Sequence, residues 1–213
     1  MSVDREKQVA AEAAAQFVEN GMTVGLGTGT TVAYLLPALA RRRLSVRCVA
    51  TSPRTEQTAR GLGLDVEPVG TIDHLDMTID GADQVTPDGW LIKGGGAAHT
   101  REKIVATMAT TFIVIADSTK PVNALRPPVP VELLEFGLDA TLRRLEHVTL
   151  RDVPRSPDGG VIGDYRGAVN DPAALAARLS ATPGLVEHGL FPPELVTVVL
   201  IGHGESVEQR ILR

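Results

Sequence analysis

Residues 22–31 read MTVGLGTGTT, an apolar run of strand length that passes into a glycine-bearing loop. Apolar residues with helical spacing follow at Val32, Leu35 and Leu39, so the segment predicts a strand, a tight loop and a helix. Pro37 should kink that helix or end a short first piece. The glycines alternate along the loop, which differs from the dinucleotide-binding spacing, and a P-loop sequence does not occur. The loop fits a small phosphate or sugar hydroxyls, and a tight turn that binds nothing is the plainer alternative.

Two further apolar runs lead into loops with polar chemistry. Residues 75–79 precede the acidic turn DGAD at 80–83, and residues 90–92 precede KGGGAAHTREK at 93–103. In the second of these, the glycines allow a ligand to approach backbone amides, and Thr100 should cap a helix that runs through Thr111. Ligands of open α/β sheets bind beyond the carboxyl ends of the strands. If the three strands are parallel neighbours, their loops face one crevice, although each motif alone is also a generic turn.

Strands and helices alternate over the first 120 or so residues. Residues 9–18 have helical spacing, residues 46–50 and 112–116 read as strands, and Ser52 with Pro53 predicts a capped helix start. This order predicts a Rossmann-like α/β fold with a doubly wound, mainly parallel sheet. We expect the domain to span residues 1–127.

The rhythm changes after residues 121–130, which contain four prolines and predict a crossing between domains. Strands at 129–133, 148–151 and 161–165, with a helix from Asp171-Pro172 to Leu179, predict a smaller α+β, ferredoxin-like domain over residues 128–194. The run 195–201 is apolar throughout, which is typical of a buried parallel strand. We therefore expect residues 195–213 to complete the first domain.

Composition narrows the class of protein. The chain has 213 residues, 43% hydrophobic and 22% charged, with a net charge of −5, and this balance favours an ordinary globule that binds neither nucleic acid nor membrane. A start without an apolar signal region and a lone cysteine, Cys48, predict the cytoplasm. The five histidines lack metal-ligand spacing, so we interpret all of them as surface or core residues. They are His74, His99, His147, His188 and His203.

Taken together and in this order, the motifs resemble the A-type ribose-5-phosphate isomerases over nearly the whole chain. The resemblance depends on the segments at residues 25–31, 51–52, 80–83, 93–98, 100–103, 116–120, 129–132 and 183–185. It implies an isomerase of the non-oxidative pentose phosphate pathway in carbohydrate metabolism. Such an enzyme interconverts D-ribose 5-phosphate and D-ribulose 5-phosphate without metal or cofactor, as a homodimer or homotetramer.

The resemblance also implies roles for individual residues. Its catalytic base falls on Glu102, which would move one proton between neighbouring carbons through a cis-enediolate. Asp80 and Lys93 would join it as catalytic residues, assisting ring opening and facing the developing oxyanion. The implied substrate-binding residues are Thr28, Gly29, Thr30, Thr31, Asp80, Gly81, Ala82, Asp83, Lys93, Gly94, Gly95, Gly96 and Lys120.

Two departures from the family pattern and two competing classes remain. Gln84 stands where the family usually has Glu, and residues 134–166 match poorly. An amino-sugar-phosphate deaminase or an acyl-CoA transferase would share the sheet but lacks the arrangement from Lys93 to Glu102. A sugar-phosphate sensor would keep the binding loops, but such regulators normally carry a DNA-binding helix pair, and the sequence has no basic recognition helix.

Overall fold

The computed structural model describes residues 2–213, and contacts along the chain divide it into two compact units. The first unit contains the described residues up to Ala82, then Arg101–Lys120 and Glu194–Arg213. The second contains Asp83–Thr100 and Pro121–Pro193. The domain boundaries given above stay a prediction. Within residues 2–213, none of the helices is both long enough and apolar enough to cross a membrane.

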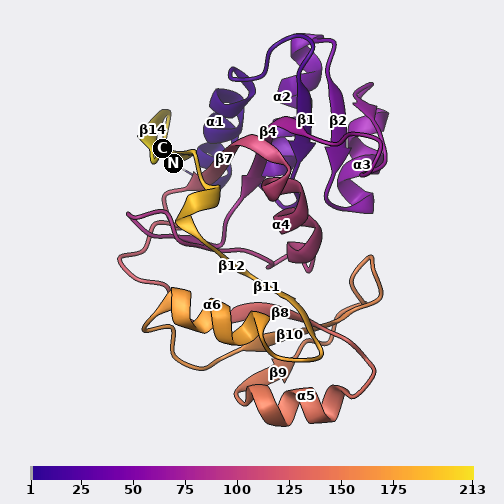
Figure 1. Cartoon of the computed structure of the whole chain (residues 1–213). Coiled ribbons are helices and arrows are strands. Elements are labelled where there is room, and N and C mark those ends of the chain that lie inside the picture. Colours follow the sequence, from indigo (N-terminus) through magenta and orange to yellow (C-terminus); the bar gives the residue numbers. More distant parts are fainter. Residues whose placement is uncertain (1) are drawn as a thin grey trace. The chain divides into compact units, whose positions relative to one another are not determined.

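The first unit is built on a seven-stranded sheet with the order β14-β13-β7-β4-β1-β2-β3 (Figure 1). Its strands are β1 Thr23–Leu26, β2 Arg47–Ala50, β3 Asp65–Val66, β4 Leu75–Gly81, β7 Ala109–Asp117, β13 Val198–His203 and β14 Ser206–Ile211. Every pairing is parallel except that of β13 with β14. The prediction of a mainly parallel sheet rejoined by the C-terminal segment is therefore confirmed.

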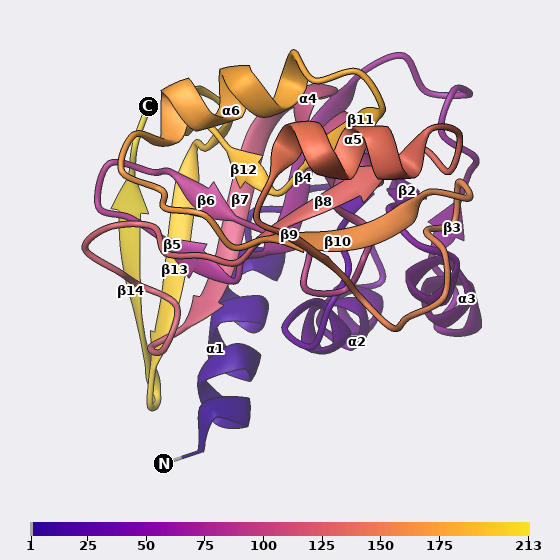
Figure 2. The ribbon, with the colours of Figure 1, turned by 90° about the horizontal axis from the view of Figure 1, so that it is seen from below.

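Helices cover both faces of this sheet. They are α1 Val3–Ala15, α2 Val32–Arg42, α3 Pro53–Gly61 and α4 His99–Thr107, of which α4 begins in the second unit and continues in the first. Figure 2 shows α1, α2 and α3 along one side of the sheet, where their apolar residues share a core with Leu26, Ile79 and Ile113. Cys48 lies in this core, and burial raises the pKa of its thiol to about 12, so the group stays protonated near neutrality.

Local sequence signals account for several helix ends. Ser52 accepts a hydrogen bond from the amide of Thr55 and precedes a proline in the first turn of α3, as predicted. Asp171 caps the second unit's α6 in the same way. Pro37 does not divide α2, because the helix is continuous from Val32 to Arg42. The helix predicted to reach Thr111 ends at Thr107, since the residues from Ala109 onward pair with β4 as part of β7.

The second unit contains two smaller sheets. The four-stranded sheet has the order β11-β8-β10-β9 with antiparallel pairing, and the chain order is strand, α5, two strands, α6, strand. These elements are β8 Val129–Leu133, α5 Leu138–Leu145, β9 Val148–Leu150, β10 Val161–Tyr165, α6 Pro172–Ser180 and β11 Leu185–His188. This arrangement is ferredoxin-like, as predicted.

The three-stranded sheet corrects one prediction. It contains β5 Gln84–Val85, β6 Leu91–Ile92 and β12 Leu190–Phe191, all antiparallel. The condition that the strand before Lys93 is a parallel neighbour of β1 and β4 is not met, because β6 pairs only with β5 and β12 among the described strands. Only nine residues separate Gly81 from Leu91, and a parallel crossover needs a dozen or more. The chain turns back on itself through β5 instead.

Candidate functional site

The carboxyl ends of β1 and β4 meet at a point where one side chain is missing. Gly27 follows β1 opposite Asp80 of β4, and a Cβ added at Gly27 would overlap the Asp80 carboxyl group. The carboxylate therefore lies over the end of β1, where its Oδ1 accepts hydrogen bonds from the amides of Thr28 at 3.0 Å and Gly81 at 2.7 Å. Asp80 is only 1% exposed. The sequence placed Asp80 in a turn, whereas the structure makes it the buried end of a strand.

The hydroxyl of Thr28 is the centre of a cluster that joins the loop after β1 to the start of α3. Its Oγ1 lies 2.7 Å from Thr51 Oγ1, 2.8 Å from Ser52 Oγ and 3.3 Å from Thr55 Oγ1. Thr55 in turn donates to the carbonyl of Gly27 at 2.9 Å. These bonds fix the loop after β1 against the start of α3. Thr28 is therefore held by the protein, and its hydroxyl already has partners at the start of α3.

The remainder of this loop leads into α2 with its amides exposed. Gly29 has φ of +127°, a conformation that side-chain-bearing residues rarely adopt, and Gly29 and Thr30 are exposed. Thr31 is the residue before α2, and its side chain makes no capping hydrogen bond. The first turn of the helix thus presents backbone N–H groups and the positive end of its dipole beside Gly29 and Thr30. This geometry suits an anion such as a phosphate.

Helix α4 carries Glu102 across the opposite face of the sheet from α1. Its Val105 packs so close to Gly25 that a Cβ there would overlap the valine, and the carbonyl of Val105 accepts from Thr78 Oγ1 at 3.1 Å. The helix ends near Ala109, where β7 starts, so it runs antiparallel to the strands. Glu102 therefore lies about one turn further toward the strands' carboxyl ends. It is 3% exposed, so its carboxyl group is buried on the face of the sheet that also carries Gly27 and Asp80.

Lys120 follows β7 at the same edge of the sheet. The amide of Lys120 donates to the carbonyl of Asp117 at 3.1 Å, and Lys120 is half-buried. The turn is tied to α1 by Glu6, which accepts from the amide of Ser118 at 3.1 Å and from its hydroxyl at 2.6 Å. The Ser118 hydroxyl bond is the main reason that the pKa of Glu6 is lowered. The turn that presents Lys120 is thus anchored on both sides.

In the second unit, the glycine turn after β6 is ordered by Asp83. The amide of Gly95 donates to Asp83 Oδ2 at 2.8 Å, and Gly94 has φ of +106°. A Cβ at Gly94 would come within 2.8 Å of His99 Nδ1, so both conformation and space require glycine. Lys93, just before the turn, is 2% exposed, and its Nζ lies 5.4 Å from the centroid of the Phe191 ring. The Lys93 side chain is therefore buried directly beside a turn that is rich in backbone amides.

Comparison with known proteins identifies the family. The family model described as ribose 5-phosphate isomerase A (phosphoriboisomerase A) matches residues 47–206. The ribose-5-phosphate isomerase A of Caulobacter vibrioides (strain NA1000 / CB15N) is 44% identical over 97% of this chain and 98% of its own length. The chain belongs to the ribose 5-phosphate isomerase A family.

Solved structures of the family have the same fold. The ribose 5 phosphate isomerase A of Neisseria gonorrhoeae is 30% identical, superposes with a TM-score of 0.95, and is covered over 98% of its chain and 100% of this one. A D-ribose-5-phosphate isomerase in complex with phospho-erythronic acid is 33% identical with a TM-score of 0.94, over 99% of this chain and all of its own. A second family model, the DeoR C terminal sensor domain, matches residues 3–61, a region that contains the loop after β1.

The structure groups the residues predicted from the isomerase A resemblance by unit. The first unit brings Thr28–Thr31, Asp80–Ala82, Glu102 and Lys120 to the carboxyl-end side of its parallel strands. The second unit joins Asp83 to the turn Lys93–Gly96. Among residues 2–213, no group of three or more His, Cys, Asp or Glu side chains is arranged to hold a metal ion.

Two residues that bear on these loops were missed in the sequence. Thr55 lies in the first turn of the helix predicted from Ser52 and Pro53, and its hydroxyl faces Gly27 and Thr28, a contact that this position could have suggested. Arg151 was counted as the end of a strand, but its guanidinium reaches the carbonyls of the glycine turn. No local pattern marks Arg151, because it is 55 or more residues from that turn in sequence.

Proposed function

We propose that this protein is an aldose–ketose isomerase that interconverts D-ribose 5-phosphate and D-ribulose 5-phosphate through a cis-enediolate. The observation that carries the proposal is the placement of Glu102, a nearly buried carboxylate on α4, toward the carboxyl ends of β1 and β4, where Gly27 and Asp80 meet. A single carboxylate that reaches two adjacent carbons is sufficient for this reaction. The matching motifs and the family membership of the chain support the same reaction.

Glu102 is the proposed base. In the direction from aldose to ketose it removes the proton from C2, and the electrons form the enediolate with oxygens on C1 and C2. Glu102 then returns the proton to C1. Burial of the carboxylate excludes water that would compete for the proton, and general-base catalysis of this kind contributes about 10²- to 10⁴-fold.

Asp80 is proposed to assist ring opening and to carry the proton that moves between O1 and O2. Its Oδ1 is already occupied by the amides of Thr28 and Gly81, so the carboxylate is held in one orientation before substrate arrives. Such preorganisation avoids reorganisation during the reaction. Gly81 and Ala82 complete the strand end that presents this side chain.

The phosphate is proposed to bind at the loop after β1. Exposed Gly29 and Thr30 and the uncapped start of α2 at Thr31 offer the donors that a phosphate requires, and the hydroxyl cluster at Thr28 holds this loop in place. Lys120 is assigned to the same anion, because its turn follows β7, which is separated from β1 by β4 alone, and is anchored by Glu6. Binding energy from the phosphate helps to align the reacting carbons.

Lys93 and Asp83 are the proposed contributors from the second unit. Lys93 is assigned to the developing oxyanion, where a preorganised donor is typically worth about 3 kcal/mol. Its low exposure strengthens that interaction, because little water screens the charge. Asp83 orders the turn Gly94–Gly96 through the amide of Gly95, and we assign the turn's other amides, at Gly94 and Gly96, to the sugar oxygens.

We further propose that the enzyme acts in the cytoplasm, in the non-oxidative pentose phosphate pathway, and without metal or cofactor. Self-association as a homodimer or homotetramer is also proposed. The second unit exposes Phe136 at 92% and Leu134 at 51%, and large apolar side chains at such exposure favour burial between copies. We assign nothing to nucleic acid or membrane partners.

The test is direct formation of ribulose 5-phosphate from ribose 5-phosphate by the purified protein, with a chelator present. Turnover that the chelator leaves unchanged is expected. Turnover that is lost with chelator and restored by a divalent metal would reassign Asp80 and Asp83 as metal ligands. Binding of ribose 5-phosphate without any turnover would instead support a sensor, the reading related to the match at residues 3–61.

A further inference from the structure

The carbonyls of the glycine turn are held by an arginine from a different part of the second unit. Arg151 follows β9, and its Nη1 donates to the carbonyl oxygens of Gly94 at 2.9 Å and Gly95 at 3.3 Å. Its Nη2 donates to Asp164 Oδ1 on β10 at 2.7 Å. The two side chains are only 17% and 12% exposed. The guanidinium is therefore a partly buried bridge between the hairpin β9–β10 and the turn.

Peptide geometry gives this bridge a directional consequence. In a trans peptide, the carbonyl and the following N–H point in opposite directions. Holding the oxygens of Gly94 and Gly95 toward Arg151 therefore turns the N–H groups of Gly95 and Gly96 away from it. The Gly95 amide donates to Asp83 Oδ2, so the Asp83 carboxylate lies on the far side of the turn from Arg151.

The turn needs such a constraint because its sequence restricts the backbone conformation very little. Three successive glycines sample both signs of φ, and the structure requires +106° at Gly94. Arginine suits the task because its planar fork can hold two carbonyls and a carboxylate at once, whereas a lysine ammonium is a point charge without that geometry. The backbone supports the placement, since the amide of Arg151 donates to the carbonyl of Ile162 at 2.9 Å and fixes its position beside β10.

We propose that Arg151 is a positioning residue for the isomerase reaction, which orients the amide of Gly95 toward Asp83 and the amide of Gly96 toward the substrate, and that Asp164 holds Arg151 in place. The proposal rests on the proposed function, because it assigns the Gly96 amide to the sugar. Arg151 itself contacts the carbonyl side of the turn and acts through the peptide groups.

The first experiment measures kcat and KM for ribose 5-phosphate in Arg151→Ala, Arg151→Lys and a matched control, Arg166→Ala. Arg166 also approaches Asp164, at 3.8 Å, but is 56% exposed and makes no contact with the turn that the structure records. We expect kcat/KM to fall about 10- to 100-fold in both Arg151 variants, the range for loss of a charge-assisted hydrogen bond. Arg166→Ala should stay within about twofold of the unaltered protein, as surface changes usually do.

Chemical rescue separates positioning from general stability. Guanidinium at a low, non-denaturing concentration should restore part of the turnover of Arg151→Ala, and should leave the unaltered protein and Arg166→Ala unchanged. If Arg151→Ala does not fold, Arg151→Lys retains a cation and a long side chain and decides the question. Unchanged kcat/KM in the variant that folds would overturn the proposal.

Amide hydrogen exchange at residues 94–98 tests the structural step independently of turnover. Exchange in these amides should be faster in Arg151→Ala than in Arg166→Ala. Equal exchange in the two variants would show that Arg151 does not order the turn. If the unaltered protein lacks isomerase turnover, the proposed function fails on its own, and a turn that still loosens in Arg151→Ala confines Arg151 to ordering the backbone.

Discussion

The two ends of strand β4 carry the same residue type in opposite circumstances. Asp76 near the start and Asp80 near the end lie four residues apart, so both side chains point to the same face of the sheet. Each reaches toward β1. Asp76 accepts from the amide of Thr23 at 2.8 Å and its hydroxyl at 2.9 Å, and Asp80 accepts from the amide of Thr28. Asp76 is exposed, whereas Asp80 is buried.

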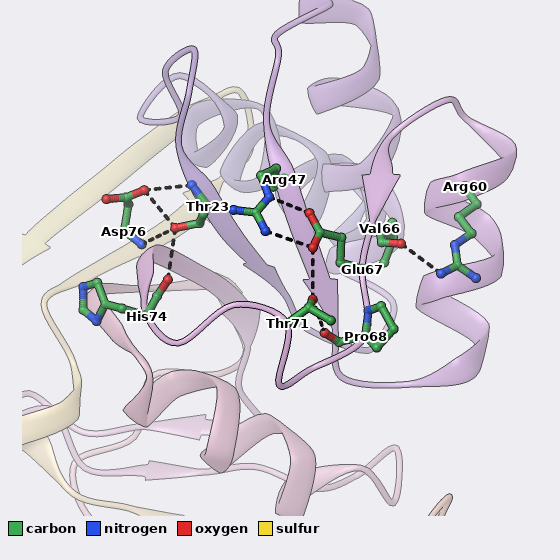
Figure 3. A network of polar contacts seen from close by, with 9 residues as sticks. All are labelled: Thr23, Arg47, Arg60, Val66, Glu67, Pro68, Thr71, His74 and Asp76. Carbon is green, nitrogen blue, oxygen red and sulfur yellow. Dashed lines mark hydrogen bonds and ion pairs between the residues drawn. The ribbon is translucent and has the colours of Figure 1, made fainter.

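The difference arises from the β1 residue opposite each aspartate. Thr23, opposite Asp76, supplies a hydroxyl and keeps the carboxylate at the surface, within the polar network of Figure 3. In a separate group of contacts in Figure 3, Arg47 at the start of β2 forms a two-point contact with Glu67. Gly27, opposite Asp80, supplies no side chain, so the carboxylate folds over the strand end. One end of the sheet is closed by polar side chains, and the other leaves backbone amides and buried carboxylates for a ligand.

The largest effect should come from Glu102→Gln. The amide keeps the size of the side chain but cannot accept the C2 proton, so we expect kcat to fall about 10²- to 10⁴-fold while the melting temperature and ribose 5-phosphate binding persist. Turnover and calorimetric binding measure the two quantities separately. Turnover at the unaltered rate would remove Glu102 from the mechanism and with it the chemical distinction between the two ends.

The next largest change in kcat is expected from replacing an aspartate by asparagine at the two ends of β4. Asp80→Asn keeps an oxygen that can accept from Thr28 and Gly81 but lacks the charge that the proposed proton transfer needs, so kcat should fall about 10²-fold. Asp76→Asn is the matched control and should leave kcat and KM unchanged. Equal losses in the two variants would mean that the sheet responds as a whole and that Asp80 has no special role.

A smaller effect is expected from filling the space opposite Asp80. Gly27→Ala places a methyl group where the carboxyl group lies, and such overpacking typically costs about 1–3 kcal/mol. At about 2–4 °C per kcal/mol for a chain of this size, the melting temperature should fall by several degrees, with about a tenfold loss of turnover.

Gly61→Ala serves as the control for this change, because a Cβ at Gly61 meets nothing within 4 Å and the residue lies in α3. It should be neutral or slightly stabilising, since alanine has the higher helix propensity. A Gly27→Ala protein that melts and turns over like Gly61→Ala would show that the Asp80 carboxylate can move aside without loss.

Sequence reasoning predicted what is local in these regions and missed what depends on strand pairing. The alternation of strands and helices, the cap at Ser52 and the glycine loops each depend on neighbours within a few residues, and they were predicted correctly. Helix α5 escaped prediction although Leu138, Leu142 and Leu145 have helical spacing, because the segment departs from the family pattern. Strand β14, SVEQRI, has the polar composition of an exposed edge and gives only a weak signal.

The candidate residues were found as a set of motifs, but their environments were not. Nothing in the order Asp80-Gly81-Ala82-Asp83 shows that Asp80 is buried and Asp83 exposed, because Gly27 lies 53 residues away in sequence. The same reason hid Arg151, whose contact with Gly94 spans 57 residues. Burial and long-range hydrogen bonds depend on residues that are far apart in sequence and meet only in the folded protein, so no local motif reveals them.

The smallest expected effect concerns acid stability at the closed end. Hydrogen bonds from the amide and then the hydroxyl of Thr23 lower the pKa of Asp76 below its usual value of 3.8. A lowered folded-state pKa means that the stabilisation is fully present above the unfolded pKa and is lost as pH falls through the folded one. Asp76→Asn should therefore melt at a slightly lower temperature than the unaltered protein at neutral pH. The loss in free energy of unfolding should be less than about 1 kcal/mol, because the group is exposed.

The decisive measurement is the difference in melting temperature between the two proteins as pH is lowered from 7 through the range below 4. The difference should shrink and vanish at the acid end, because a protonated Asp76 resembles asparagine in charge. Other carboxylates with lowered pKa values, such as Glu6 and Glu67, contribute equally to both proteins and cancel in the comparison. A difference that stays constant with pH would mean that Thr23 holds the side chain by shape alone, and that the closed end of the sheet does not depend on the Asp76 charge.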